Sequence, residues 1–380
     1  MYTRLIQNTV EKWLFKGKII IIYGPRQAGK TTLSKQILEK YGDDGLYLNC
    51  EFHSIKEQLK VAEPALIRAF LGNKKIVVLD EAQSIQNIGR ILKTFIDEYK
   101  DIQIIATGSS SFDLANKINE PLTGRSIELT LLPLSVKEII DNDGMPDFRA
   151  NEETIFRFGL YPGVYNKKKS QEAMRVEIET IESGYLYKDI LSFDEIRKPT
   201  ILKDILKLLA FQVGNEVSLN EIAQKLEIST GTVDKYIDLL EKCFITKRIY
   251  AFSRNLRNEV KKSFKVYFID IGIRNSIIQN YNSIDSRPND IGALFENFFV
   301  IERFKKSINP GKSPYYYFWR TYDQKEIDLI EEYGGQLHAF ECKYSDAKKM
   351  SASTKRTFLE TYPNSEINIA TKKNYLDFLL

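Results

Sequence analysis

The chain has 380 residues, a net charge of +4 and 43% hydrophobic residues. This length exceeds that of one average domain and predicts two or three domains, each with its own core. Apolar runs such as residues 19–22 are too short to span a bilayer, so we expect no membrane partner. The three cysteines and two histidines are too few and too scattered for a disulfide framework or for a metal centre built on either residue type.

The N-terminal segment MYTRLIQNTVEKWLFKGK has the apolar spacing of an amphipathic helix. It lacks the apolar core and the small-residue cleavage site of a secretory signal. We therefore expect a cytoplasmic protein.

The first 130 residues or so alternate short β-branched runs with helical patterns. This alternation predicts an α/β fold, a parallel sheet covered by helices on both faces. The apolar run at 126–134 closes the sheet, and residues 135–195 are mainly helical, as expected for a helical lid. The first predicted domain therefore spans residues 1–195.

A phosphate-binding loop is predicted where the first apolar run ends. Residues 24–31 fit the pattern G-x-x-x-x-G-K-[ST], with a strand pattern before them and a helix pattern after them. In such a P-loop, backbone amides wrap the phosphates, the lysine neutralises their outer oxygens and the hydroxyl binds magnesium. The alternative is a glycine-rich turn without a ligand. The residues expected to contact ATP are Gly24, Pro25, Arg26, Gln27, Ala28, Gly29, Lys30, Thr31 and Thr32.

Acidic and hydroxyl residues follow two later strand patterns. Asp80 and Glu81 end the run IVVLDE, and the carboxyl ends of strands are where ligand crevices open in α/β sheets. We expect Thr31 and Asp80 to hold magnesium, Asp80 through water, and Glu81 to polarise the water that attacks the γ-phosphate. A pair of solvated acids is the alternative. Ser109, with Thr107 as the second choice, would report the γ-phosphate, although hydroxyl residues also end strands for ordinary turn reasons.

These motifs resemble the AAA+ superfamily, and more narrowly a family of bacterial and archaeal ATPases that carry an uncharacterised C-terminal domain. The resemblance covers nearly the whole chain and is carried by GPRQAGKTT, VVLDE, ATGSSS, LTGRSIELTLLPLS, GLYPGV, YLYKDI and the C-terminal EID and ECK. It implies that Arg125, directly before the last core strand, reaches the nucleotide of a neighbouring subunit as an arginine finger, which requires a homo-oligomer. An arginine that pairs locally is the alternative.

A winged helix-turn-helix domain is predicted at 196–281. Ser218 and Glu221 give a helix-start signature, and short helical patterns precede two strand patterns. The second helix is acidic, which suits protein docking better than a phosphate-lined groove. A basic strip at 247–265 suits contact with the DNA backbone, or is the solvated face of a hairpin. Its members are Lys247, Arg248, Arg254, Arg257, Lys261, Lys262 and Lys265.

A third domain is predicted at 282–380, after a polar linker at 282–290. Asp328 and the run Glu341-Cys342-Lys343 lie in strand patterns, and alternation places Glu341 and Lys343 on one face. Two carboxylates of this kind would hold Mg²⁺ or Mn²⁺, and the lysine would orient or activate a water for attack on phosphorus.

Together with Glu296 in the preceding helix, this arrangement resembles the PD-(D/E)xK nuclease superfamily and implies a restriction-endonuclease-like α/β domain. Ile327 stands where the strict motif has proline. The alternative is a set of edge-strand charges that pair with each other at the surface. The whole chain is thus predicted to be a magnesium-dependent AAA+ ATPase coupled to a domain that binds DNA, with DNA cleavage as a candidate second activity. The alternative function is an ATP-dependent regulatory or defence switch that binds protein or nucleic acid without nuclease activity.

Overall fold

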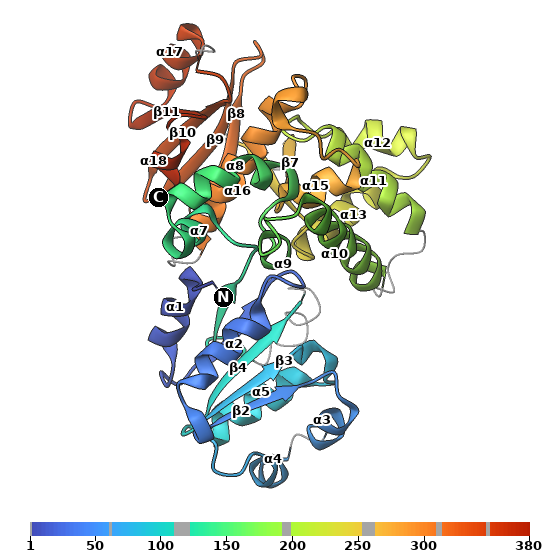
Figure 1. Cartoon of the computed structure of the whole chain (residues 1–380), viewed down its shortest axis with the longest axis vertical. Helices are drawn as coiled ribbons and strands as arrows, with labels where there is room; N and C mark the ends of the chain where they lie inside the picture. The colour runs from blue at the N-terminus through green and yellow to red at the C-terminus, as the bar shows by residue number, and fades with distance from the viewer. Residues whose placement is uncertain are drawn as a thin grey trace. The chain divides into compact units, whose positions relative to one another are not determined.

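The computed structural model describes residues 2–60, 63–109, 122–191, 199–252, 263–308, 314–346 and 350–380. The chain forms two compact units, one made of residues 1–133 with 242–244 and the other of 134–241 with 245–380. Figure 1 shows the elements of both units.

The first unit is built on a parallel sheet with the strand order β2-β3-β4-β1-β5 among its described strands. Because β4 lies between β1 and β3, its carboxyl end lies beside the carboxyl ends of both. Every residue of β1, β3 and β4 is buried, as expected for strands covered on both faces. The strands are β1 (Ile19–Tyr23), β2 (Gly45–Asn49), β3 (Ile76–Asp80), β4 (Gln103–Gly108) and β5 (Ser126–Thr130).

Helices cover both faces of this sheet (Figure 1). Alternate residues of β1 enter different cores: Ile20 and Ile22 pack with α1 and α2, whereas Ile19 and Ile21 pack with α4 and α5. The predicted parallel α/β sheet is therefore confirmed. The helices are α1 (Leu5–Trp13), α2 (Lys30–Glu39), η1 (Gly42–Asp44), α3 (His53–Gln58), α4 (Pro64–Leu71), η2 (Ala82–Ser84) and α5 (Ile88–Glu98).

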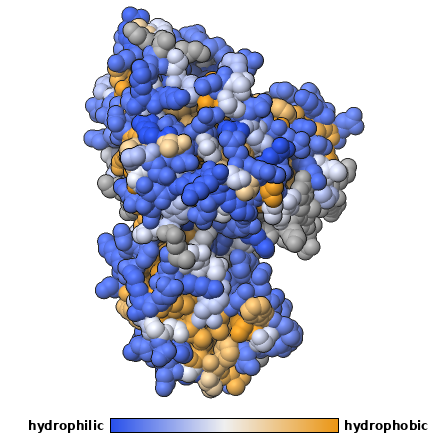
Figure 2. All heavy atoms as spheres, viewed as in Figure 1, coloured by the Kyte–Doolittle hydropathy of each residue, from blue (hydrophilic) through white to orange (hydrophobic). Residues whose placement is uncertain are grey.

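Part of the surface of the first unit is apolar. Figure 2 shows hydrophobic residues gathered over α3 and α4. Phe52 and Leu66, which belong to this segment, are exposed large hydrophobic residues. Exposed apolar surface of this kind is typical of a contact with another macromolecule.

The second unit contains a mixed sheet with the order β11-β10-β9-β8-β6-β7 among its described strands. The strands are β6 (Thr246–Ala251), β7 (Phe264–Phe268), β8 (Tyr315–Arg320), β9 (Glu326–Tyr333), β10 (Gln336–Lys343) and β11 (Ser365–Thr371). The helices are α7 (Val136–Asp143), α8 (Met145–Phe158), α9 (Pro162–Tyr165), α10 (Gln171–Leu191), α11 (Pro199–Phe211), α12 (Leu219–Lys225), α13 (Thr230–Lys242), α15 (Ile271–Ile277), η3 (Ile284–Ser286), α16 (Ile291–Ile308), α17 (Ala352–Thr361) and α18 (Tyr375–Leu379).

These units differ from the predicted division at 195/196 and 281/282. The hairpin β6–β7 of the predicted winged helix pairs with β8, with Tyr250 opposite Tyr317, so both predicted domains share one sheet. The predicted lid also belongs to the second unit, where α8 and α10 pack against α15. Contacts of this kind join segments that are far apart in the sequence, which periodicity does not reveal.

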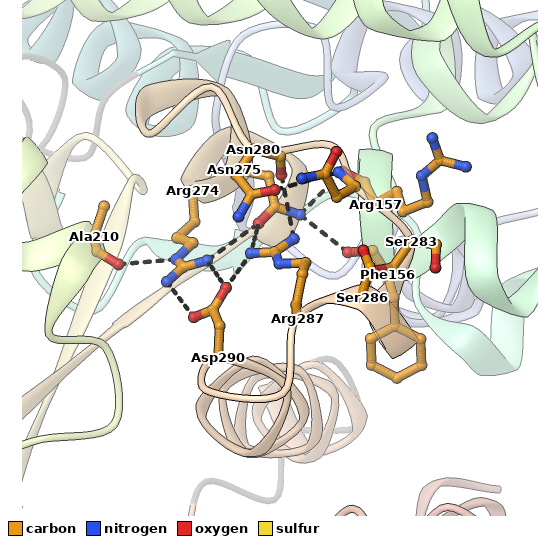
Figure 3. Close-up of polar contacts among 11 residues, drawn as sticks. Phe156, Arg157, Ala210, Arg274, Asn275, Asn280, Ser283, Ser286, Arg287 and Asp290 are labelled. Carbon is orange, nitrogen blue, oxygen red and sulfur yellow. Dashed lines mark hydrogen bonds and ion pairs between the residues drawn. The ribbon is translucent and has the colours of Figure 1, made fainter.

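The predicted linker at 282–290 is instead tied into the second unit by a buried polar network (Figure 3). Arg274 of α15 donates to both carboxylate oxygens of Asp290, at 2.7 and 2.6 Å, and Arg287 bonds the same carboxylate. Although burial acts to raise it, the two guanidiniums lower the pKa of Asp290. Asn275 accepts from Arg287 at 3.1 Å and donates to the carbonyl of Phe156 at 3.0 Å. The segment is therefore anchored to the core through Arg287 and Asp290.

The predicted helix start at Ser218 is present, since its hydroxyl accepts the N–H of Glu221 at 3.2 Å. Helices α11, α12 and α13 precede the hairpin β6–β7 in the order that a winged helix requires. The winged helix itself stays a prediction.

Candidate functional site

The predicted phosphate-binding loop connects the carboxyl end of β1 to the amino end of α2. Glycine is required at position 24, because a Cβ there would lie 2.0 Å from the carbonyl oxygen of Leu131. Gly29 caps α2 with φ 101°, a left-handed conformation that favours glycine. The loop leads into a ten-residue helix, and the first N–H groups of a helix have no carbonyl partner within it, which makes a helix start a site that binds anions.

Lys30 is the first residue of α2, directly after this loop. Its side chain is almost fully buried, and Nζ donates to the carbonyl oxygens of Gly24 at 2.8 Å and of Pro25 at 2.9 Å. These bonds hold the ammonium against the loop, where phosphate oxygens bound by the amides would meet it.

The Thr31 hydroxyl and the Asp80 carboxylate lie together at the carboxyl edge of the sheet. Thr31 Oγ1 donates to Asp80 Oδ2 at 2.7 Å, and the hydroxyls of Tyr47 and Thr107 bond the same carboxylate. Adjacent ligands of octahedral magnesium, at bonds of about 2.1 Å, lie about 3 Å apart. The two residues predicted to hold magnesium, Thr31 directly and Asp80 through water, are therefore brought within hydrogen-bond distance of each other.

Glu81 begins the turn after β3 in a left-handed conformation with φ 52°, and its N–H donates to Thr107 Oγ1 at 3.1 Å. Gln83 Nε2 donates to the Glu81 carboxylate and, at 3.0 Å, to Ser109 Oγ. The structure thus joins the residue predicted to polarise water to the residue predicted to report the γ-phosphate. Gln83 was not predicted, because a glutamine in a turn carries no signal of this role.

Arg4 was also missed. Its guanidinium is buried and donates to the carbonyl oxygen of Ala28 in the loop at 2.7 Å and to that of Leu132 after β5 at 2.6 Å. Arg4 therefore fixes the loop against the end of the sheet. Arg4 and Ala28 are 24 residues apart in the sequence, so local sequence patterns do not predict this contact.

Arg125 precedes β5 and lies at the amino edge of the parallel sheet, opposite the edge that carries Lys30 and Asp80. Its Nε lies 3.3 Å from Asp97 Oδ1 of α5, and both side chains are partly exposed. Arg125 thus pairs locally, at the edge of the sheet opposite the predicted nucleotide site of its own chain. Its role at a neighbour's site stays a prediction.

In the second unit, Asp328 of β9, Glu341 and Lys343 of β10, and Glu296 of α16 lie in one buried region. Asp328 Oδ2 accepts the N–H of Cys342 at 2.8 Å, and Lys343 Nζ lies 2.6 Å from Glu341 Oε1. Burial and the charge of Asp328 raise the pKa of Glu341 to about 7. Across the described ranges, however, no group of three or more His, Cys, Asp or Glu side chains is arranged to hold a metal ion.

Lys265 of β7 lies among these acids, although the sequence had suggested that it belongs to an exposed basic strip. Only 1% of its surface is exposed, and Nζ lies 3.0 Å from Glu296 Oε1, 3.9 Å from Asp328 Oδ1 and in contact with Glu326. Although burial acts to lower it, the charges of Glu296, Asp328 and Glu326 raise the pKa of Lys265. The paired strands β6 and β7 bring Lys265 here, so its assignment to a phosphate-binding surface was wrong.

The other described members of the strip are paired with acids of α13. Lys247 Nζ lies 2.7 Å from Glu241, and Arg248 bonds Asp234, Asp238 and Glu241. Arg254, Arg257, Lys261 and Lys262 lie outside the described residues.

Comparison with known proteins agrees with the first site. Residues 16–140 match the AAA domain family. This match supports an AAA-type P-loop ATPase. Residues 150–283 and 291–376 match two domains of unknown function, DUF8612 and DUF4143.

Relatives occur in bacteria and archaea. Uncharacterized proteins of Mycobacterium tuberculosis and Mycobacterium bovis are each 25% identical over 350 residues, which cover 91% of this chain and 75% of theirs. An uncharacterized protein of Methanocaldococcus jannaschii is 25% identical over 354 residues, covering 86% of this chain and 75% of that protein.

Among solved structures, one chain in the structure of Drosophila ORC bound to AT-rich DNA and Cdc6 aligns with 72% of this chain and 92% of its own length. The identity is 12% and the TM-score 0.26, a similarity that supports no functional argument. Within the part of the chain that the structure describes, no helix combines the length and apolar character needed to cross a membrane.

Proposed function

We propose that the protein binds ATP with magnesium and hydrolyses it in its first unit. The observation that carries the proposal is the contact of Thr31, at the start of α2, with Asp80, at the end of β3, beside the buried Lys30. Lys30 and the loop amides would bind the β- and γ-phosphates. Thr31 and Asp80 would hold magnesium, which neutralises the charge that develops on the phosphates.

Glu81 would orient the attacking water, and Ser109 would contact the γ-phosphate. Gln83 donates hydrogen bonds to both side chains, which supports this pairing of roles. A γ-phosphate that contacts Ser109 would alter the bond from Gln83, and Gln83 also holds Glu81. Gln83 would therefore act as a positioning residue.

ATP binding is tested with the substitution Lys30→Ala. Loss of the ammonium should weaken ATP affinity at least tenfold by isothermal titration calorimetry while the fold persists, because the carbonyl oxygens that Nζ bonds, those of Gly24 and Pro25, belong to the loop itself. Lys12→Ala, on the exposed face of α1, is the matched control. Equal affinities for wild type and Lys30→Ala would refute the P-loop assignment.

Hydrolysis is tested with Glu81→Gln, which removes the water-polarising carboxylate and keeps the phosphate contacts. ATP should bind normally, and turnover should fall by about 10²-fold or more. Unchanged turnover would assign the base to another residue.

We also propose that the chain forms a homo-oligomer in which Arg125 acts at a neighbouring nucleotide. The position of Arg125 at the edge of the sheet opposite its own loop supports a role in another subunit. The exposed apolar surface over α3 and α4 supports association (Figure 2).

For the second unit we propose DNA binding, with metal-dependent cleavage as a second candidate activity. The gathering of Asp328, Glu341 and Lys343 favours cleavage. Plasmid and branched DNA incubated with Mg²⁺ or Mn²⁺ should then be cut by wild type and left intact by Asp328→Ala, with ATP hydrolysis unchanged. Binding without cleavage in either metal would favour the regulatory or defence switch instead.

DNA contact through the predicted basic strip would show in the salt dependence of binding. Neutralising Arg254, Arg257, Lys261 and Lys262 together should flatten the fall of affinity with salt, because fewer counterions are released. An affinity that responds neither to salt nor to these substitutions would indicate protein docking instead.

A further inference from the structure

The acidic cluster of the second unit consists of Glu296, Glu326, Asp328 and Glu341, with Lys265 buried among them. Lys265 comes from β7, whereas the acids come from α16, β9 and β10. Its Nζ lies 3.0 Å from Glu296 Oε1 and 3.9 Å from Asp328 Oδ1, and it contacts Glu326. A single ammonium is thus shared by acids from two elements.

This arrangement is fixed by its surroundings. Tyr267, two residues along β7, donates to Glu296 Oε1 at 2.7 Å, and Lys265 Nζ lies 5.3 Å from the centre of the Phe318 ring. The strand β7 is buried along its whole length. Lys265 is therefore shielded from solvent by its own strand and by the acids around it.

The cluster also offers an open acceptor. Glu341 is more than nine-tenths buried, and among the described residues its Oε2 has no hydrogen-bond partner. A buried carboxylate oxygen without a partner is costly and is normally satisfied by a cation, a proton or water. The cluster thus has the oxygen-rich chemistry that Mg²⁺ and Mn²⁺ prefer, but an ammonium occupies its centre.

We propose that Lys265 is the built-in cation of this cluster, and that a divalent metal ion binds the acids only when Lys265 is displaced. A metal bound at 2.0–2.3 Å to Glu296 and Asp328 would lie within a few ångströms of the ammonium, and the like charges would repel. Hence Mg²⁺ or Mn²⁺ and Lys265 compete for the same carboxylates. The inference deepens the proposed metal-dependent site of the second unit and does not depend on ATP hydrolysis.

The test measures Mn²⁺ binding to the full chain, without nucleotide or DNA, by isothermal titration calorimetry and electron paramagnetic resonance. Lys265→Met should gain a site at least about tenfold tighter than any wild-type site in this cluster. Lys265→Arg, which keeps the charge, should not gain it. Lys265→Met with Asp328→Asn should lose the gain and supplies the background from the nucleotide site.

A second variant guards against misfolding, because Lys265→Met leaves buried acids without their counter-charge. Lys265→Met with Glu326→Gln removes one positive and one negative charge and keeps Glu296, Asp328 and Glu341. It should also gain the site, and Mn²⁺ should raise its melting temperature.

Gain of an Asp328-dependent Mn²⁺ site in either Met variant, and not in Lys265→Arg, would support the proposal. The proposal would be overturned by either of two results. One is a wild-type protein that binds Mn²⁺ at Asp328 as tightly as the Met variants do. The other is that neither Met variant gains an Asp328-dependent Mn²⁺ site. The test measures Mn²⁺ binding and not DNA cleavage. Its result therefore does not depend on whether the protein is a nuclease.

Discussion

The contact between Arg4 and the phosphate-binding loop gives a prediction that only the structure supports. Arg4→Ala removes two charge-assisted hydrogen bonds, to the carbonyl oxygens of Ala28 at 2.7 Å and of Leu132 at 2.6 Å. Hydrogen bonds from a charged group contribute about 1.5–3 kcal/mol each, and water entering the space would recover part of this. We therefore expect the free energy of unfolding of the first unit to fall by about 3 kcal/mol.

The same change should weaken ATP binding. Ala28 belongs to the loop that wraps the phosphates, so losing its anchor should let the amides move and raise the dissociation constant about tenfold. Arg4→Lys keeps the charge and reaches only one carbonyl at a time. Its free energy of unfolding and its ATP dissociation constant should therefore lie between those of wild type and Arg4→Ala.

The measurement uses urea unfolding followed by tryptophan fluorescence. The chain has two tryptophans. Trp13 packs on the core of the first unit, so a Trp319→Phe background lets Trp13 report that unit alone. Arg90→Ala, on the exposed face of α5, is the control. If the free energy of unfolding of Arg4→Ala differs from that of wild type by less than about 0.5 kcal/mol, and both bind ATP with the same affinity, the assigned role of Arg4 is wrong.

Three further predictions concern other parts of the chain. Gly24→Ala should lose about 2 kcal/mol or more of stability, measured by urea unfolding, and most ATP affinity, because the added Cβ lies 2.0 Å from the Leu131 carbonyl; Gly292→Ala, whose Cβ meets no atom within 4 Å, should change neither. Mixing Arg125→Ala with Glu81→Gln should restore ATP hydrolysis at mixed interfaces, and a monomer with concentration-independent specific activity would rule this out. Burial raises the pKa of Glu182, so its stabilising effect is present below the ordinary carboxyl pKa and is lost as pH rises through the folded value. The melting temperature of Glu182→Gln relative to wild type should therefore be higher at pH 8 than at pH 4.5, and an equal difference at both pH values would contradict the assignment.

The geometry of the predicted nucleotide site followed from the sequence because its parts are local. The loop from Gly24 to Thr31 is contiguous, and its glycines, lysine and hydroxyl are needed by backbone geometry and phosphate charge. Asp80 and Glu81 follow an apolar run, and in a parallel sheet the carboxyl ends of all strands lie at one edge. The pattern therefore placed Asp80 near Thr31, and the structure shows them 2.7 Å apart.

The second unit was predictable only in part. Asp328, Glu341 and Lys343 could be placed on strands, because side chains alternate along a strand with a period of two. Pairing between strands is not encoded in that period. Lys265 therefore gave the pattern of an exposed charge, while the pairing of β6 with β7 and β8 buries it among acids.

The sequence by itself determined the elements, the phosphate-binding loop and the residue types around it, because these depend on the conformational and chemical preferences of neighbouring residues. Only the tertiary structure decided that Arg4 anchors the loop, that Gln83 joins Glu81 to Ser109, and that the segment at 282–290 is held by Arg287 and Asp290. Each of these side chains makes a hydrogen bond or ion pair. The stabilisation that such a contact gives depends on burial and on partners that folding brings close. A charged or polar residue looks the same in the sequence whether it faces water or a buried partner.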